Sequence, residues 1–289
     1  MLQFPGFRGV RLGTVIVLFW RNVTHPSFTL RGSAMAFSFF FALFPGLLFA
    51  LSWLSYLPFE RFDALLQYRL GEVLPPPVYQ LVHDIVFQEL YGRKNWTLLS
   101  TSLFLAMYSL WQGMLTMLRA FLHDDMPKPP FWVLWIRALW LVGFLLLLVI
   151  ANLTFSFLQD RHLSAMLSAI LHSPVGPGVE VLLGILKFIT LFLIVSGVVE
   201  VMYRAGMPRR SLPYIISPGA FIATFLLGAA MKLLSWYFLA VANFSRFYGS
   251  IAAVIALMVW FYWLSIVLLV GFEINYSLYR SILRTRDTF

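Results

Sequence analysis

The sequence predicts an all-α fold: a polytopic membrane protein with a six-transmembrane-helix bundle, an N-terminal interfacial helix and an external helical hairpin. Hydrophobic residues make up 61% of the 289 residues. Charged residues make up 11%, compared with about 25% in soluble domains. Several uncharged runs reach the roughly 20 apolar residues that a bilayer core requires. The Lys and Arg residues gather in alternate connections between these runs, as is typical of multi-pass proteins.

Six apolar segments are long enough to span a membrane. Each is expected to be a helix, because backbone groups in lipid must pair within their own segment. The predicted spans are residues 34–57, 96–118, 131–158, 179–203, 214–241 and 248–279. The domain organisation that follows is a cytoplasmic N-terminus with the interfacial helix (1–33), a transmembrane domain (34–279) with an external loop (58–95), and a cytoplasmic tail (280–289).

The distribution of positive charge sets the orientation. Thirteen Lys and Arg residues lie on the side that holds both termini, and six lie on the other side. The positive-inside rule then places both termini in the cytoplasm. An even number of spans requires the termini to share a side, so the count and the charge agree.

Two segments are apolar but are not predicted to span. Residues 10–20 are too short and are flanked by arginines, so we expect an interfacial helix. Residues 59–70 and 78–90 are amphipathic and are separated by the three prolines at 75–77, which predicts a helical hairpin on the outer face. A structural lid and a substrate gate are the two interpretations of this hairpin.

Two lysines within the spans are the candidate substrate-binding residues, because an ionisable side chain in lipid is costly unless it is paired or hydrated. At about 1.5 Å per residue, Lys187 lies roughly 12 Å and Lys232 roughly 13 Å from the external end of its span. We interpret them as the lining of a hydrated cationic cavity for an anionic headgroup or metabolite. The alternative is that each ammonium group snorkels to the outer headgroups.

Two glutamates near the inner boundary of the spans form a candidate polar latch. Glu200 has Arg204 four residues later, the spacing of an ion pair along a helix. Glu273 precedes Asn275, and we expect it to pair with an arginine of the connection between spans four and five. The alternatives are a plain interfacial ion pair for Glu200 and proton transfer for Glu273.

Two proline–glycine pairs are predicted to kink spans. Pro45 and Gly46 interrupt the first span, and Pro218 and Gly219 lie near the start of the fifth. Proline removes a backbone hydrogen bond and so opens a helix locally. Such a kink serves either as a hinge or as a packing feature.

Hydrolytic chemistry has little support in the sequence. There is no cysteine, which excludes disulfides and thiol catalysis. The five histidines lack metal-ligand spacing, and neither a phosphate-binding glycine loop nor a nucleophile elbow occurs. His123 stands in an acidic cluster with two aspartates, which we interpret as a solvated turn. We therefore predict no catalytic residue, no metal and no cofactor.

Short motifs in the C-terminal third occur in the order of a known family. They are Pro208-Arg209-Arg210, Ser217-Pro218-Gly219-Ala220, Tyr248-Gly249-Ser250, Trp260-Phe261-Tyr262 and Gly271-Phe272-Glu273-Ile274-Asn275. With these motifs the chain resembles the YihY/virulence factor BrkB family of bacterial inner-membrane proteins, formerly mislabelled ribonuclease BN. The resemblance implies a six-span bundle in the bacterial cytoplasmic (inner) membrane and a role in transport or lipid translocation.

These observations favour an integral inner-membrane protein that transports or translocates an anionic substrate and is not an enzyme. The net charge of +9 is explained by basic loops that face anionic headgroups. The predicted partners are membrane lipids, anionic ones included, and a second copy of the chain, but not nucleic acid. The alternative is a non-transporting scaffold of the cell envelope, and a membrane-bound ribonuclease or other hydrolase comes third.

Overall fold

The computed structural model describes residues 12–54, 56, 95–123, 125–150, 177–208, 217–241 and 245–286. Within these residues the chain forms helices joined by short connections, without a β-strand. Five helices are long and apolar enough to cross a membrane, and α8 is a further apolar helix. The predicted fold class, a polytopic helical membrane protein, is confirmed.

One short helix precedes six longer ones in the described chain. They are α1 (Leu12–Val23), α2 (Pro26–Leu54), α5 (Trp96–Ala120), the helix Phe131–Ile150, α7 (Pro177–Gly206), α8 (Pro218–Val241) and α9 (Ser245–Arg286). At about 1.5 Å per residue, α8 measures about 35 Å and can cross a hydrocarbon core of about 30 Å. Helix α8 is therefore long enough for a sixth passage beside the five candidate spans.

Helices α2 and α9 extend furthest beyond the predicted spans. Helix α2 begins at Pro26, eight residues before the predicted start at residue 34, and proline is favoured at a first helical position. This earlier start places Arg31 inside the helix. Helix α9 continues to Arg286, past the predicted end at residue 279. The predicted external hairpin lies outside the described residues.

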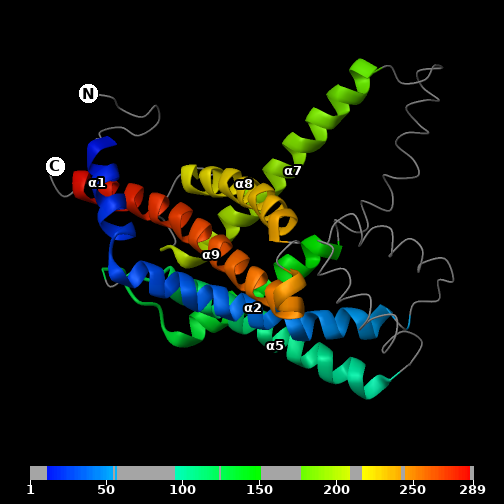
Figure 1. Ribbon diagram of the computed structural model, residues 1–289. Helices are drawn as coiled ribbons and strands as arrows, with labels where there is room; N and C mark the ends of the chain where they lie inside the picture. The colour runs from blue at the N-terminus through cyan, green and yellow to red at the C-terminus, as the bar shows by residue number, and fades with distance from the viewer. Residues whose placement is uncertain are drawn as a thin grey trace.

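Contacts between helix ends show that the helices alternate in direction. Arg31 near the start of α2 donates to the carbonyl of Ala120 at the end of α5 and to Glu273 near the end of α9, each at 2.9 Å. Arg137, early in the next helix, donates to the carbonyl of Ala205 at the end of α7 at 2.8 Å. We call the end of the bundle where these contacts occur the polar end. The start of α1 and the end of α9 both lie there (Figure 1).

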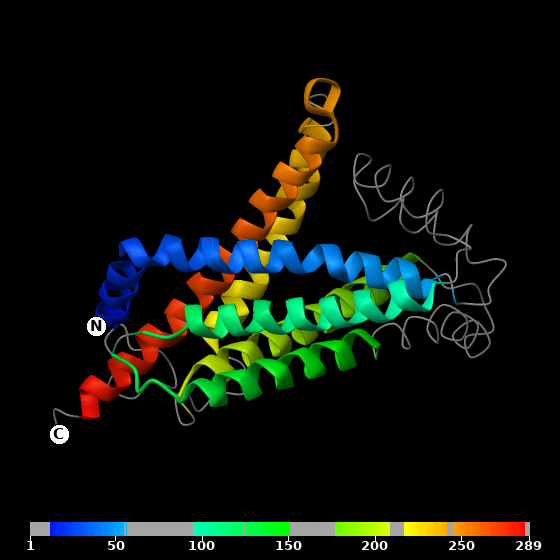
Figure 2. The ribbon, with the colours of Figure 1, turned by 90° about the horizontal axis from the view of Figure 1, so that it is seen from below.

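The tightest packing also lies near the polar end. Helix α9 contacts α1, α2 and α8, and α2 contacts α5. The backbones of α8 and α9 approach each other at two glycines: a Cβ on Gly271 would lie 2.7 Å from the carbonyl oxygen of Gly219. Phe121 and Phe272 stack with ring centroids 4.2 Å apart. Away from the polar end, the α8–α9 hairpin diverges from α2 and α5 (Figure 2).

Four exposed tryptophans lie near the two ends of the bundle, and Trp140 and Trp263, 57% and 58% exposed, lie between them. Trp20 is 66% and Trp132 55% exposed near the polar end, whereas Trp53 is 51% and Trp96 72% exposed at the opposite end. Tryptophan is enriched at both membrane–water interfaces, because its ring is apolar and its N–H is polar. The polar end is therefore expected to lie at one headgroup layer.

Candidate functional site

A buried carboxylate on α9 collects donors from three other segments. The side chain of Glu273 is fully buried. Arg31 Nη2 donates to Oε1 at 2.9 Å, and Asn22 Nδ2 donates to Oε2 at 3.1 Å. His123 Nε2 lies 3.1 Å from Oε2. A carboxylate only accepts hydrogen bonds, and these three side chains satisfy both of its oxygens.

Each donor is positioned by the end of a helix. Asn22 lies in the last turn of α1, and His123 follows the end of α5. Arg31 lies in the second turn of α2, and its Nη1 also donates to the carbonyl of Ala120. Carbonyls in the last turn of a helix lack intrahelical partners, so Arg31 satisfies one of them while it holds Glu273.

The ring of His123 is packed rather than solvated. It stacks on the Tyr276 ring with centroids 3.9 Å apart, and its side chain is 13% exposed. Its Nδ1 lies 3.2 Å from the carbonyl oxygen of Phe121. The prediction of a solvated turn is therefore wrong for His123. Asp125 is 55% exposed and pairs with Arg280 at 2.7 Å.

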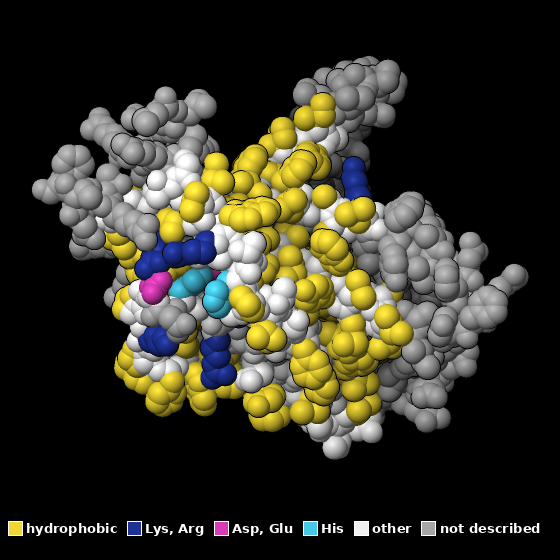
Figure 3. All heavy atoms as spheres, turned by 60° about the vertical axis from the view of Figure 1, so that its left-hand side comes forward, with side chains coloured by type: hydrophobic (Ala, Val, Ile, Leu, Met, Phe, Trp, Pro, Cys, Tyr) yellow, Lys and Arg dark blue, Asp and Glu magenta, His cyan; other side chains and the backbone are white. Residues whose placement is uncertain are grey.

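A cavity of about 520 Å³ opens beside Glu273. It is lined by Arg21, Asn22, His25, Ser27, Arg31, Leu122, His123 and Asp125. Lys, Arg and His side chains gather around an acidic one on this face, with hydrophobic surface beside them (Figure 3). All three side chains that contact Glu273 also line the cavity, so a ligand there would meet the same donors.

A second buried carboxylate, Glu200 on α7, contacts the start of α8 and an exposed arginine of its own helix. Its Oε2 accepts from the Ser217 backbone N–H at 2.9 Å and from the Ser217 hydroxyl, and its Oε1 accepts from Arg204 Nε at 2.6 Å. Asn275 Nδ2 donates to Ser217 Oγ at 2.6 Å, and its Oδ1 accepts from the Gly219 N–H at 2.8 Å. This network joins α7, α8 and α9.

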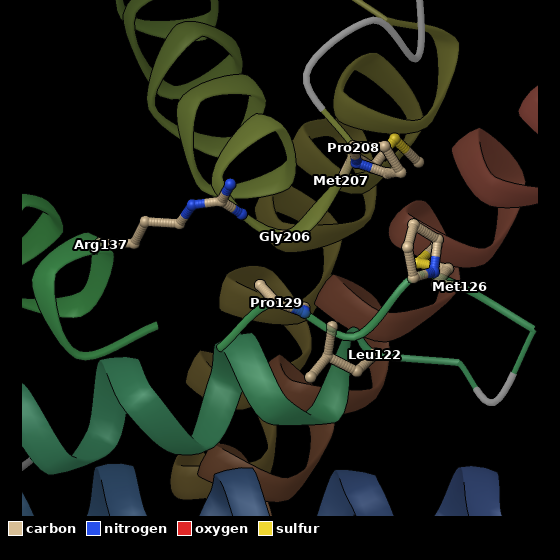
Figure 4. Close-up of a pocket in the computed structure, with 8 residues that line it drawn as sticks. Leu122, Met126, Pro129, Arg137, Gly206, Met207 and Pro208 are labelled. Atoms are coloured by element: carbon tan, nitrogen blue, oxygen red, sulfur yellow. The ribbon is translucent and has the colours of Figure 1, made fainter. Parts of the chain in front are cut away.

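A smaller cavity of about 180 Å³ lies between the connection that follows α5 and the end of α7 (Figure 4). Its described lining is mostly apolar and includes Met126 and Met207. The charged side chain in this lining, Arg137, extends toward the end of α7, where it donates to the carbonyl of Ala205. This cavity is a weaker candidate for a polar ligand, because its charged group already caps a helix.

Comparison with known proteins assigns the family. The profile of the family described as Virulence factor BrkB matches residues 19–288. The chain belongs to the BrkB family. The ribonuclease-like protein YfkH of Bacillus subtilis (strain 168) is 29% identical over 273 residues, which cover 91% of this chain and 94% of YfkH. No solved structure gives a significant match. The family resemblance predicted from the motifs is confirmed, and this BrkB-family protein is a multi-pass membrane protein.

The two candidate lysines lie on helices that separate. Lys232 is on α8 with an exposed side chain, and Lys187 is on α7 with a side chain outside the described residues. Phe192 of α7 contacts Phe221 of α8 with centroids 5.0 Å apart. Beyond this contact α7 and α8 diverge (Figures 1 and 2). The cationic cavity between the lysines stays a prediction.

The structure changes the interpretation of the proline–glycine pairs. Pro218 and Gly219 do not interrupt a helix, since they are the first two residues of α8. Proline suits a first helical position, because its missing N–H would have no intrahelical partner there. Pro45 lies inside α2, and a Cβ on Gly46 would meet no atom within 4 Å. The kink at that pair stays a prediction.

The partners of the latch residues are partly those expected from the sequence. Arg204 pairs with Glu200, as the helical spacing predicts. Glu273 pairs with Arg31, and Arg209 and Arg210 of the α7–α8 connection lie outside the described residues. The position of Arg31 could have been predicted from the sequence, because Pro26 marks a helix start and so places Arg31 on that helix. No local spacing could reveal His123, which is 150 residues from Glu273.

Metal binding finds no support in the described part of the chain. Among those residues, no group of three or more His, Cys, Asp or Glu side chains is placed to hold a metal ion.

Proposed function

We propose that this BrkB-family protein is a transporter or lipid-translocating protein of the bacterial inner membrane, not an enzyme, and that it binds an anionic substrate at the polar end. The supporting observation is the cavity lined by Arg21, Arg31, His25 and His123. Guanidinium and imidazolium groups form strong charge-assisted hydrogen bonds to phosphate and carboxylate oxygens. The volume of about 520 Å³ suits a small anionic group.

Helix α1 supports a lipid headgroup as the substrate. Its inner face buries Leu18 and packs on α9 through Val15, while Ile16, Val17 and Trp20 are 60%, 68% and 66% exposed. A helix with such an outward apolar face lies in the membrane interface. The cavity residues Arg21 and Asn22 follow Trp20 directly, so the cavity opening lies beside the headgroups.

The proposal also includes an orientation. The polar end holds the start of α1 and the end of α9, and thirteen of the Lys and Arg residues lie on that side of the predicted topology. The positive-inside rule makes that side cytoplasmic. The substrate would then be drawn from the inner leaflet.

Reconstituted vesicles test this function. We would measure the transbilayer movement of fluorescent phosphatidylglycerol and phosphatidylcholine, with uptake of radiolabelled sulfate as the arm for a free anion. Faster movement of phosphatidylglycerol than in protein-free vesicles is expected, and uptake of sulfate without lipid movement would assign a soluble substrate. Arg21→Gln should slow the movement about tenfold, the effect of one lost charge-assisted contact.

The matched control is Arg119→Gln, which removes an exposed arginine of α5 that does not line the cavity. This variant should keep the wild-type rate. Rates equal to those of protein-free vesicles for both the lipids and sulfate would contradict the proposal and favour a scaffold. YfkH is named a ribonuclease-like protein, so RNA is the remaining substrate to test. Cleavage of labelled RNA by the wild type and its loss in His123→Gln would favour the hydrolase.

A further inference from the structure

We propose that the cavity at the polar end binds its anion together with one proton, which the His123–Glu273 pair carries. This inference rests on the proposed function of the cavity and adds to it a source of energy, because a substrate that binds with a proton can be moved by a proton gradient. The argument uses the partners of the imidazole ring, the charges around it and the position of the cavity.

Both ring nitrogens of His123 face groups that only accept hydrogen bonds. Nδ1 lies 3.2 Å from the carbonyl oxygen of Phe121, and Nε2 lies 3.0 Å from Oε1 of Glu273 and 3.1 Å from its Oε2. A neutral imidazole carries one N–H and can satisfy only one of these acceptors. An imidazolium satisfies both, so this geometry provides an acceptor for each N–H of a ring that has taken up a proton. The proton comes from bulk water through the cavity, on whose wall His123 lies.

The proton decides the charge beside the cavity. Arg31 and Glu273 form an ion pair at 2.9 Å, so their charges cancel. Arg280 and Asp125 cancel in the same way at 2.7 Å. Protonation of His123 therefore adds one positive charge to the cavity wall, beside that of Arg21. A positive charge on the cavity wall attracts an anion, and by linkage a bound anion favours the protonated state to the same extent.

The buried position of Glu273 strengthens this linkage. Its three partners, Arg31, His123 and Asn22, all line the cavity. An anion in the cavity competes with the carboxylate for these donors. A fully buried carboxylate that loses donors is costly, and a proton on the pair relieves that cost.

Other charged or titratable groups border the pair and are separable by mutation. They are Arg21 on α1, His25 between α1 and α2, Asp125 after α5, and Tyr276 and Arg280 on α9. His25 is the other histidine of the cavity, but its Nδ1 lies 2.8 Å from Ser27 Oγ, a hydroxyl that can donate as well as accept. Its contacts therefore do not require a second ring proton.

Calorimetry on the full-length protein in lipid nanodiscs tests the inference. Sulfate and short-chain phosphatidylglycerol are the probes, because neither titrates near neutral pH. Each is titrated in buffers of different ionisation enthalpy, which gives the number of protons taken up per anion. We expect uptake of up to one proton, and an affinity that falls as pH rises, by at most about tenfold per pH unit.

Two variants assign the proton. Glu273→Gln and His123→Gln should bind sulfate with a flat pH profile and with proton uptake near zero. His25→Asn should keep the uptake, and so should the matched control Glu200→Gln, which alters the buried carboxylate outside the cavity. A thermal unfolding curve for each variant shows that it is folded.

The outcomes separate the two proposals. Wild-type binding without proton uptake overturns the proton inference and leaves the anion site standing. Uptake that persists in both His123→Gln and Glu273→Gln, or that disappears in His25→Asn, also overturns it. Failure of the wild-type protein to bind either probe overturns the proposed function, and the proton inference with it.

Discussion

The two buried glutamates of this protein have different surroundings, although both lie near the polar end. Glu200 accepts from the backbone and hydroxyl of Ser217 in a closed contact between α7, α8 and α9. Glu273 accepts from Arg31, Asn22 and His123, which come from separate segments and all line a cavity. The first arrangement fixes helices together, and the second exposes its donors to a ligand.

This difference shows that burial of a charge alone does not identify a functional site. Glu200 is 5% exposed and Glu273 is fully buried, so their burial is nearly equal. They differ in the place of their partners: all three partners of Glu273 line the cavity at the polar end, whereas Ser217 and Arg204, the partners of Glu200, do not line it. The predictions below test whether the Glu200 region is structural and the Glu273 region binds ligand.

The largest effect is expected at the backbone contact beside the Glu200 network. In Gly271→Ala the new Cβ would lie 2.7 Å from both the Gly219 carbonyl oxygen and the Ala223 Cβ, so α8 and α9 must separate. We expect a loss of about 3 kcal/mol or more in unfolding free energy, from overpacking together with the polar bonds lost. Thermal unfolding in detergent measures it.

The matched control for this prediction is Gly228→Ala on α8. A Cβ at Gly228 would meet no atom within 4 Å, so its effect should stay within about 1 kcal/mol. Equal stability of Gly271→Ala and Gly228→Ala would show that the α8–α9 contact is looser than the structure has it.

The second prediction is rescue by an anion at one glutamate only. Glu200→Ala leaves the buried Ser217 N–H without its acceptor, and Glu273→Ala removes the acceptor of three donors, so each should cost about 2–3 kcal/mol. Sulfate can replace the carboxylate only at Glu273, because its donors line the cavity. At a concentration 100 times its dissociation constant it should return about 2.7 kcal/mol.

Thermal unfolding with and without sulfate measures this rescue, and chloride at equal ionic strength controls for screening. The intact cavity of the wild type and of Glu200→Ala also binds sulfate, so the rescue is the stabilisation of Glu273→Ala in excess of theirs. Equal stabilisation of all three proteins would show that sulfate does not take the place of the Glu273 carboxylate, and the contrast between the two glutamates would disappear.

The fold could be predicted from the sequence more completely than the site. Apolar run lengths and the Lys and Arg bias predicted six passages, because lipid forces each run to form its own hydrogen bonds. The Glu200–Arg204 pair was predictable as well, because its spacing is local. The Glu273 site was not, because Asn22, Arg31 and His123 reach it over 251, 242 and 150 residues of chain.

The third prediction separates a lipid-borne headgroup from a free anion. Trp20→Ala removes a ring that is 66% exposed on the outer face of α1, next to the cavity residue Arg21. It should weaken the binding of short-chain phosphatidylglycerol about threefold to tenfold by loss of apolar contact with the lipid. Sulfate binding should not change, because the indole is outside the cavity lining.

Trp132→Ala is the matched control for Trp20, since it removes a tryptophan that is 55% exposed near the polar end and outside the cavity lining. It should leave the binding of both probes unchanged. Equal losses for sulfate and lipid in Trp20→Ala would indicate a disturbed cavity instead of a lost lipid contact.

The smallest effect on binding at the polar end is expected from the two lysines within the spans. Lys232 is fourteen residues from the start of α8, or about 21 Å along the helix, so it is far from Glu273 and the cavity. The double variant Lys187→Met, Lys232→Met should therefore change sulfate affinity less than about twofold, because salt screens the interaction between charges separated by more than about 10 Å. If the lysines line the route of an anionic headgroup across the membrane, the same variant should slow phosphatidylglycerol movement in vesicles several-fold. Unchanged movement would exclude the cationic cavity between the lysines, and a large loss of sulfate affinity would move the primary anion site from the polar end to α7 and α8.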